Sequence, residues 1–93
     1  MPVAIYRSGG GEDYAFSFER QSDGEVRAYV QAMPGYGARP ADLHSTHRRR
    51  DGNGRYFVCR DPPPRTMEAA MRVAAAWAEL TDVYQRTGRP FPA

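Results

Sequence analysis

The sequence predicts an α+β fold, an antiparallel sheet of four or five strands followed by one long C-terminal helix packed on it. Two observations support this prediction. Short segments in the first two-thirds of the chain alternate apolar and polar side chains between turn sequences, as half-buried strands do. From residue 66 onward, apolar side chains recur with the period of an amphipathic helix. We expect a single domain over residues 1–93, with a sheet portion at 1–65, a helix at 66–88 and a flexible tail at 89–93.

The clearest strand runs from Tyr14 to Arg20, where aromatic side chains occupy alternate positions. A short strand from Val3 to Arg7 precedes it, and the glycine run between the two predicts a mobile loop. An Asp-Gly pair then predicts a turn into the next strand, residues 26–31, which completes a hairpin. The core face of this hairpin is expected to comprise Phe16, Phe18, Val26 and Val30.

The middle of the chain predicts a loop and a second hairpin. Residues 33–42 hold little that could pack, so we expect a crossing loop without regular structure. The segments 43–50 and 55–60 flank the turn sequence Asp-Gly-Asn-Gly and predict two paired strands. Because this sequence offers two different two-residue turns, the register of the pairing stays open. Consecutive prolines at 62–64 end the sheet, since proline cannot donate a ladder hydrogen bond.

Both ends of the C-terminal helix are signalled. Thr66 is the expected N-cap, and Glu68 lies in the first turn, where a negative charge is favourable. Arg86 falls in the last turn, and Gly88 follows at the expected C-terminal cap. The helical period separates two faces. The apolar face comprises Ala69, Ala70, Val73, Ala76, Trp77, Leu80 and Tyr84, and the opposite face comprises Glu68, Arg72, Glu79, Asp82 and Arg86.

The predicted helix is longer than the strands. A helix of about 21 residues is roughly 31 Å long, whereas a six-residue strand spans only about 20 Å. We therefore expect the helix to extend past the sheet and to leave Leu80, Val83 and Tyr84 in need of cover. Two arrangements would supply it: a homodimer paired through the C-terminal helix, or the loop 33–42 or the tail folded over that end.

Composition places the chain among small globular proteins of a reducing compartment. Its 93 residues are 41% hydrophobic and 26% charged, close to globular averages, and suffice for one modest core. No apolar stretch approaches the roughly 18 residues that span a bilayer, so no membrane segment is expected. The single cysteine, Cys59, cannot form an internal disulfide, which favours the cytoplasm.

Positive charge is concentrated in the middle of the chain, although the net charge is only +2. Residues 39–65 carry seven arginines against three acidic residues, whereas residues 1–38 carry three against five and residues 66–93 three against three. The chain has no lysine but many arginine, alanine, glycine and proline residues, the composition that a GC-rich bacterial coding sequence produces whatever the function. The arginine count therefore overstates the case for an anionic partner.

The run of arginines at 48–50, beside the predicted hairpin turn, is the sharpest local feature. Guanidinium groups can donate paired hydrogen bonds to phosphates, and Tyr56 can stack on a base. Our first functional hypothesis is therefore a non-catalytic domain that binds nucleic acid or another polyanion. The competing interpretation is a solvated hairpin tip, the commoner role of a short charge run. The site would comprise Arg48, Arg49, Arg50 and Arg55, with His44, His47 and Tyr56 as helpers and Arg39, Arg60 and Arg65 at its rim.

The second hypothesis is a protein-interaction or regulatory subunit that works through an aromatic and apolar surface. Its side chains would be Tyr29, Met33 and Tyr36 near the edge of the sheet, and Tyr84 and Phe91 near the end of the helix. Salt separates the two hypotheses, because phosphate binding weakens steeply as salt rises, whereas apolar contact holds or tightens.

No catalytic site, metal site or cofactor is predicted. The sequence offers no convincing pair of carboxylates, Ser-His-Asp set or Cys-His pair. His44 and His47 would point to opposite faces of the predicted strand, and no third ligand is evident. An enzyme is therefore the least favoured class.

Overall fold

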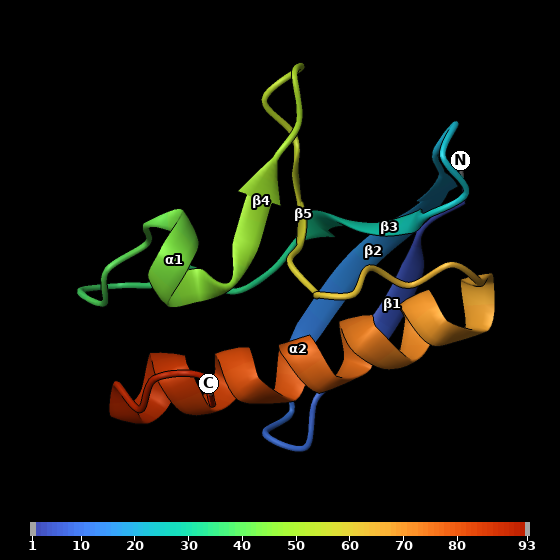
Figure 1. Ribbon diagram of the computed structural model, residues 1–93. Coiled ribbons are helices and arrows are strands. Elements are labelled where there is room, and N and C mark those ends of the chain that lie inside the picture. Colours follow the sequence, from blue (N-terminus) through green and yellow to red (C-terminus); the bar gives the residue numbers. More distant parts are fainter. Residues whose placement is uncertain (1, 93) are drawn as a thin grey trace.

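A five-stranded antiparallel sheet and one long helix packed against it form two layers (Figure 1). The computed structural model describes residues 2–92. The strand order is β1-β2-β3-β5-β4, so the pairing of β3 with β5 is the one that skips a strand of the sequence. The predicted α+β class is confirmed. The strands are β1 (Ala4–Arg7), β2 (Asp13–Arg20), β3 (Val26–Ala32), β4 (Arg48–Arg50) and β5 (Tyr56–Val58), and the helices are α1 (Leu43–Thr46) and α2 (Met67–Thr87).

The three hairpin turns share one design, in which a glycine occupies the left-handed backbone region. Gly11, Gly24 and Gly54 have φ angles of 85°, 93° and 81°, and the amide of each donates to the carbonyl three residues earlier. This is a type I turn followed by a one-residue bulge, a three-residue connection rather than the expected two-residue turn. It sets the register of the second hairpin, in which Arg50 lies opposite Tyr56.

The prediction of a strand over residues 43–50 is wrong in its first half. Leu43–Thr46 form a single helical turn, and only the last three residues of the segment pair as β4. The Asp42 side chain caps the turn by accepting from the amide three residues on at 3.0 Å, and His47 ends it with a φ of 49°. Such a bond from side chain to backbone favours a helical turn over an extended strand. The partner strand β5, predicted at 55–60, is also shorter than expected and comprises only Tyr56–Val58.

Helix α2 begins and ends where predicted. The Thr66 hydroxyl accepts from the amide three residues on at 3.1 Å, and Gly88 closes the last turn with a φ of 77°. Arg39 adds a cationic cap, because its guanidinium donates to the carbonyls of Gln85 and Arg86 at 3.3 and 3.2 Å, at the negative end of the helix dipole. Neither helix of the described chain is long and apolar enough to cross a membrane.

The core lies between α2 and the facing side of β2 and β3. The rings of Tyr14 and Phe16 meet the Trp77 ring edge-on, with centroids 6.1 and 6.0 Å apart. Of the four side chains predicted on the core face, Phe16 and Val26 are fully buried, and Phe18 and Val30 lie half-buried at its margin.

The buried face of α2 is rotated from the predicted apolar face. Ala76, expected inside, is exposed, whereas Asp82, expected outside, is only 2% exposed. The large rings of the sheet leave room for small side chains opposite them, so a row of alanines enters the core. The buried helix residues are Ala70, Ala74, Trp77, Ala78, Thr81, Asp82 and Tyr84.

Asp82 is tolerated in the core because two hydroxyl groups donate to its carboxylate. The Tyr14 hydroxyl donates to Oδ1 at 2.5 Å, and the Ser8 hydroxyl donates to Oδ2. Burial and the bond to this carboxylate raise the pKa of the Tyr14 phenol, so it remains a donor at every physiological pH. A buried charge with satisfied acceptors avoids most of the cost of desolvation.

The glycine-rich β1–β2 turn, expected to be mobile, is held on the helix. One turn before Asp82, the Glu79 carboxylate accepts from the Tyr6 hydroxyl at 2.5 Å and from the Gly9 amide at 3.0 Å. Glu79 and Asp82 therefore both bind the turn, at the neighbouring residues Gly9 and Ser8. The charged face predicted for α2 is, at these positions, a docking surface for the chain's own turn.

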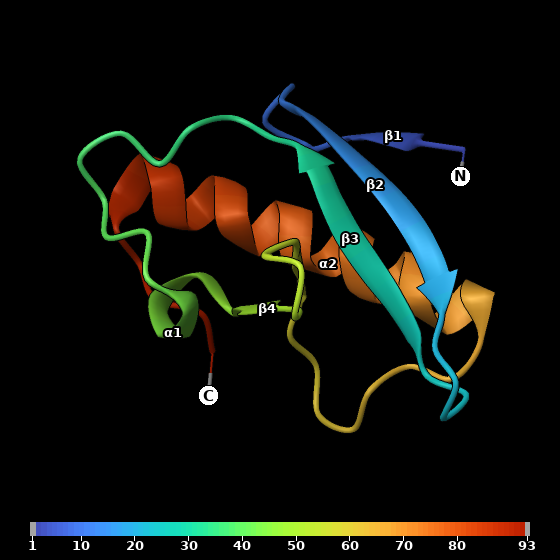
Figure 2. The ribbon, with the colours of Figure 1, turned by 90° about the horizontal axis from the view of Figure 1, so that it is seen from above.

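The end of α2 that passes the sheet is covered by the loop 33–42 (Figure 2). The Tyr84 hydroxyl donates to the Pro40 carbonyl at 2.6 Å, and its ring meets the Tyr36 ring with centroids 6.1 Å apart. The chain's own loop, one of the two arrangements that the sequence left open, thus covers Tyr84, and pairing of two copies through α2 stays a prediction.

Replacing Asp82 with alanine should lower the free energy of unfolding by about 3 kcal/mol, because it leaves the Tyr14 and Ser8 hydroxyls buried without an acceptor. Urea unfolding followed by circular dichroism measures this loss. Asp82→Asn, which keeps one acceptor, should lose less. Glu68→Ala on the exposed face is the matched control, and an equal loss there would contradict the role of Asp82.

Candidate binding groove

The arginines of the predicted basic site do not all gather on one surface, and Arg48 is a structural residue. Its side chain is buried, with Nε donating to the Thr46 hydroxyl at 2.9 Å and Nη2 to the Ala41 carbonyl at 2.8 Å. The guanidinium also lies 4.1 Å from the Tyr56 ring centroid. Arg48 therefore ties β4 to α1 and to the loop before it and is not available to a phosphate.

Arg49 and Arg50 point to opposite faces of β4, as neighbours on a strand must. Arg49 is exposed and pairs in register with Phe57. Arg50 donates to the Tyr56 hydroxyl at 3.0 Å, and its guanidinium lies 5.1 Å from that ring. Guanidinium groups of both Arg48 and Arg50 therefore contact the ring that was expected to stack on a base.

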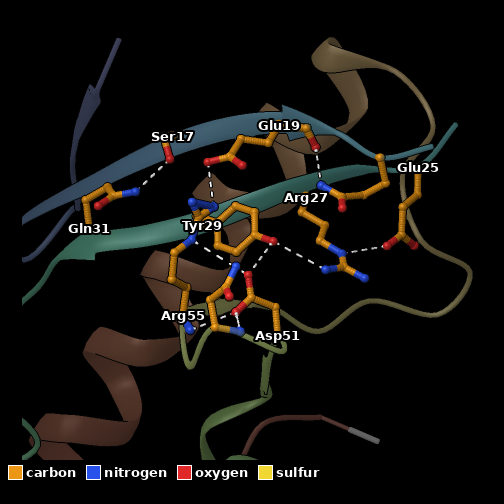
Figure 3. A network of polar contacts seen from close by, with 10 residues as sticks. Ser17, Glu19, Glu25, Arg27, Tyr29, Gln31, Asp51 and Arg55 are labelled. Carbon is orange, nitrogen blue, oxygen red and sulfur yellow. Dashed lines mark hydrogen bonds and ion pairs between the residues drawn. The ribbon is translucent and has the colours of Figure 1, made fainter. Parts of the chain in front are cut away.

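Arg55 holds the tip of the β4–β5 hairpin against the outward face of the sheet (Figure 3). Its guanidinium donates to Glu19 at 2.6 Å and lies 3.8 Å from the centroid of the Tyr29 ring. The Tyr29 hydroxyl donates in turn to Asp51 at 3.0 Å. The hairpin tip therefore buries Tyr29, and Arg55 acts within the fold.

Asp51 organises this hairpin tip from inside the turn. Its Oδ1 accepts from the amides of Asn53 and Arg55, both at 2.9 Å. The backbone amide of Arg55 is the chief cause that lowers the pKa of Asp51, and the Tyr29 hydroxyl and the Asn53 amide lower it further.

The rim residues of the predicted site lie apart from one another. Arg39 caps α2, and Arg65 donates to the Asp23 carbonyl at 2.5 Å. Arg60 is exposed beyond β5. Within the predicted set, the side chains of Arg49 and Arg60 have no hydrogen bond or ion pair to any residue of 2–92.

His44 and His47 lie on the same side of α1, which corrects the expectation of opposite faces. Their ring centroids are 6.5 Å apart, because residues three apart are neighbours on a helical turn. His47 stacks on Phe91 of the C-terminal tail at 4.5 Å, with the rings 14° from parallel. Over residues 2–92, no group of three or more His, Cys, Asp or Glu side chains is arranged to hold a metal ion.

The aromatic surface proposed from the sequence is largely internal. Each of its members packs within the chain, so they form no single exposed patch: Tyr29 lies under the hairpin tip, Tyr36 against Tyr84, Met33 against the core, and Phe91 against His47.

A groove of about 620 Å³ runs beside α2, between the helix and the proline segment 62–64. Ligand pockets commonly measure roughly 300–1,000 Å³. The part of the predicted apolar face of α2 that does not enter the core lines this groove. Its apolar lining includes Val58, Ala69, Val73, Ala76, Leu80 and Phe91.

The polar part of this groove is entirely basic or neutral. His47, Arg60 and Arg72 contribute to its lining, and no acidic side chain of the described chain does. Arg72 pairs with Glu68 at 2.7 Å, but both side chains are largely exposed, so the pair is weak and can rearrange. An apolar lining beside arginines, with no acidic residue in the lining, suits a ligand that carries apolar and anionic groups side by side.

Arg72 and Val73 are among the groove residues that neither functional hypothesis from the sequence included. The helical pattern assigned one to the solvated face and the other to the core. The signal that could have found Val73 is the width of the apolar face, because Val73, Ala76 and Leu80 form a second apolar row beside the buried alanines.

No protein-family model, curated protein or solved structure matches this chain. Its function can therefore be inferred only from its own residues.

Replacing Arg48 with methionine should lower the free energy of unfolding by about 2 kcal/mol, because the Thr46 hydroxyl and the Ala41 carbonyl lose a charged donor. Arg49→Met should change it by no more than about 0.5 kcal/mol, as an exposed substitution does. Urea unfolding of the two variants measures the contrast. Equal losses would show that Arg48 has no special structural role.

Asp51 should stabilise the fold in a pH-dependent way. Its folded-state pKa lies below the unfolded value of about 3.9, so its contribution is present above that pH and is lost as pH falls through the folded pKa. The Asp51→Asn variant keeps a side-chain oxygen that can accept from the backbone amides, but this side chain cannot ionise. Wild type should therefore be more stable than the variant at pH 7, and thermal melts should show the difference shrinking below about pH 4. A stability difference between wild type and variant that does not change with pH would refute the stabilising role of the Asp51 carboxylate.

Proposed function

We propose that this chain is a small non-catalytic binding domain that recognises an acidic, amphipathic segment of a partner protein. The observation that carries the proposal is the groove beside α2, whose lining is apolar and basic and includes no acidic residue of the described chain. We place the domain in the cytoplasm, where a lone half-exposed thiol such as Cys59 stays reduced.

The shape of the groove favours a polypeptide segment. It runs along α2 from Ala69 to Leu80 and is bounded opposite by the prolines at 62–64. Val73 and Leu80 lie about two turns apart on α2, with Ala76 between them, so two or more apolar side chains of one segment could enter the groove together. Arg60 and Arg72 would then face the acidic side of the segment, which adds orientation and speeds association.

This proposal keeps an anionic partner from the first hypothesis, but it places the contact at Arg60 and Arg72 of the groove and not at the hairpin. Nucleic-acid binding through the hairpin would need several free guanidinium groups on one surface, whereas Arg48 is buried and Arg55 is paired with Glu19 at the surface. An oligonucleotide is therefore the comparison ligand.

Replacing Val73 with glutamine should weaken binding about tenfold, equivalent to roughly 1.4 kcal/mol, because a polar group replaces an apolar contact in the groove. The probe is a fluorescent synthetic peptide with leucines on one helical face and glutamates on the other, followed by anisotropy. A peptide with lysine in place of glutamate should bind far more weakly.

Met71→Gln is the matched control, since Met71 is exposed on the same helix outside the groove lining. If the two variants bind alike, or if the lysine peptide binds as well as the glutamate peptide, the groove is not an acidic-peptide site. Oligonucleotide binding that is lost in Arg49→Gln and kept in Val73→Gln would favour the hairpin hypothesis instead.

A further inference from the structure

A second, smaller hollow of about 130 Å³ shares the proline segment with the groove. Guanidinium-bearing side chains line it from three separate segments: Arg27 on β3, Arg49 on β4 and Arg60 beyond β5. Phe57 and Pro63 contribute to the rest of its lining. Because these arginines lie far apart in the sequence, only folding brings them to one place.

Positive charge exceeds negative charge in this hollow. Arg27 is already engaged, since its Nε donates to Glu25 at 2.7 Å and its guanidinium lies 4.2 Å from the Phe57 ring centroid (Figure 3 shows the Arg27–Glu25 pair). The other carboxylate of the lining, Asp61, is exposed and forms no ion pair with a residue of 2–92. Three arginines thus face two carboxylates, one of which is already neutralised.

Arg49 and Arg60 supply the free donors. Both side chains are exposed, and neither has a hydrogen bond or ion pair to another described residue. A guanidinium in this state presents a planar fork of N–H donors to an incoming oxyanion. Two such forks that line one small hollow are the arrangement in which an oxyanion is held from two sides.

We propose that this hollow is an oxyanion site that takes a phosphoryl group between Arg49 and Arg60. Its volume is several times the roughly 30 Å³ that one water occupies in the liquid, which is room for a group with four oxygens. A planar carboxylate is satisfied by a single guanidinium fork. A tetrahedral phosphoryl group has oxygens that point in several directions and can meet donors from separate strands.

This site is distinct from the proposed peptide groove and does not depend on it. Arg49 lines the small hollow but not the groove, and Arg72 lines the groove but not the hollow. Arg60 lines both. A variant of Arg49 therefore tests the oxyanion site, and a variant of Arg72 tests the groove. Failure of one proposal leaves the other standing.

The first test is a titration with inorganic phosphate at constant ionic strength, followed through the arginine Nε–Hε signals by NMR. Saturable shifts are expected for Arg49 and Arg60. Arg49→Gln should weaken phosphate binding about threefold or more, the scale of one exposed charge pair. Asp61→Asn should tighten it by a similar factor, because a repelling carboxylate is removed. Arg89→Gln, outside the lining, is the control and should leave the affinity unchanged.

Non-saturating shifts shared by Arg89, or an unchanged affinity in Arg49→Gln or Asp61→Asn, would overturn the site. A misfolded variant cannot mimic the result, because Asp61→Asn is expected to gain affinity. A short peptide with and without one phosphoserine identifies the source of the group. Tighter binding of the phosphopeptide than of inorganic phosphate indicates a phosphorylated polypeptide, and equal affinity indicates a free phosphate. Equal binding of the unphosphorylated peptide would refute the proposal.

Discussion

The contacts of the Trp77 indole hold together the two layers on which every other feature depends. Its Nε1 donates to the Thr46 carbonyl at 3.0 Å in the buried interior, and its ring meets Tyr14 and Phe16 of β2. The same ring lines the groove beside α2. One side chain therefore joins α1, β2 and α2 and also forms part of the candidate binding surface, so the groove's position follows from core packing.

A domain of this size has a modest apolar core and relies on polar contacts at its periphery. The β1–β2 turn is bound to Glu79 and Asp82 of α2, and the tip of the β4–β5 hairpin is bound to the outward face through Asp51 and Arg55. Most arginines of the basic segment are engaged in such contacts. The arginine side chains of this segment that remain for a ligand are those without a partner among residues 2–92, Arg49 and Arg60.

Features set by neighbouring residues could be predicted from the sequence, and features set by distant residues could not. The caps of α2 at Thr66 and Gly88 depend on one turn of chain, and both were predicted. The α1 turn was missed because a single bond from Asp42 outweighs the extended pattern that surrounds it. The basic site was proposed from adjacency in the chain, yet alternation along β4 sends Arg48 inward and leaves Arg49 exposed.

The sequence by itself determined the class of fold, the first three strands, both ends of the long helix and the positions of the turns. Hydrogen bonds and side-chain periodicity over a few residues specify all of these. Tertiary structure decided which face of α2 is buried, which arginines are free and where the groove lies. Each of these depends on which surfaces meet across the fold, and no local pattern records that Tyr14 would satisfy Asp82 or that Arg49 and Arg60 would line one hollow.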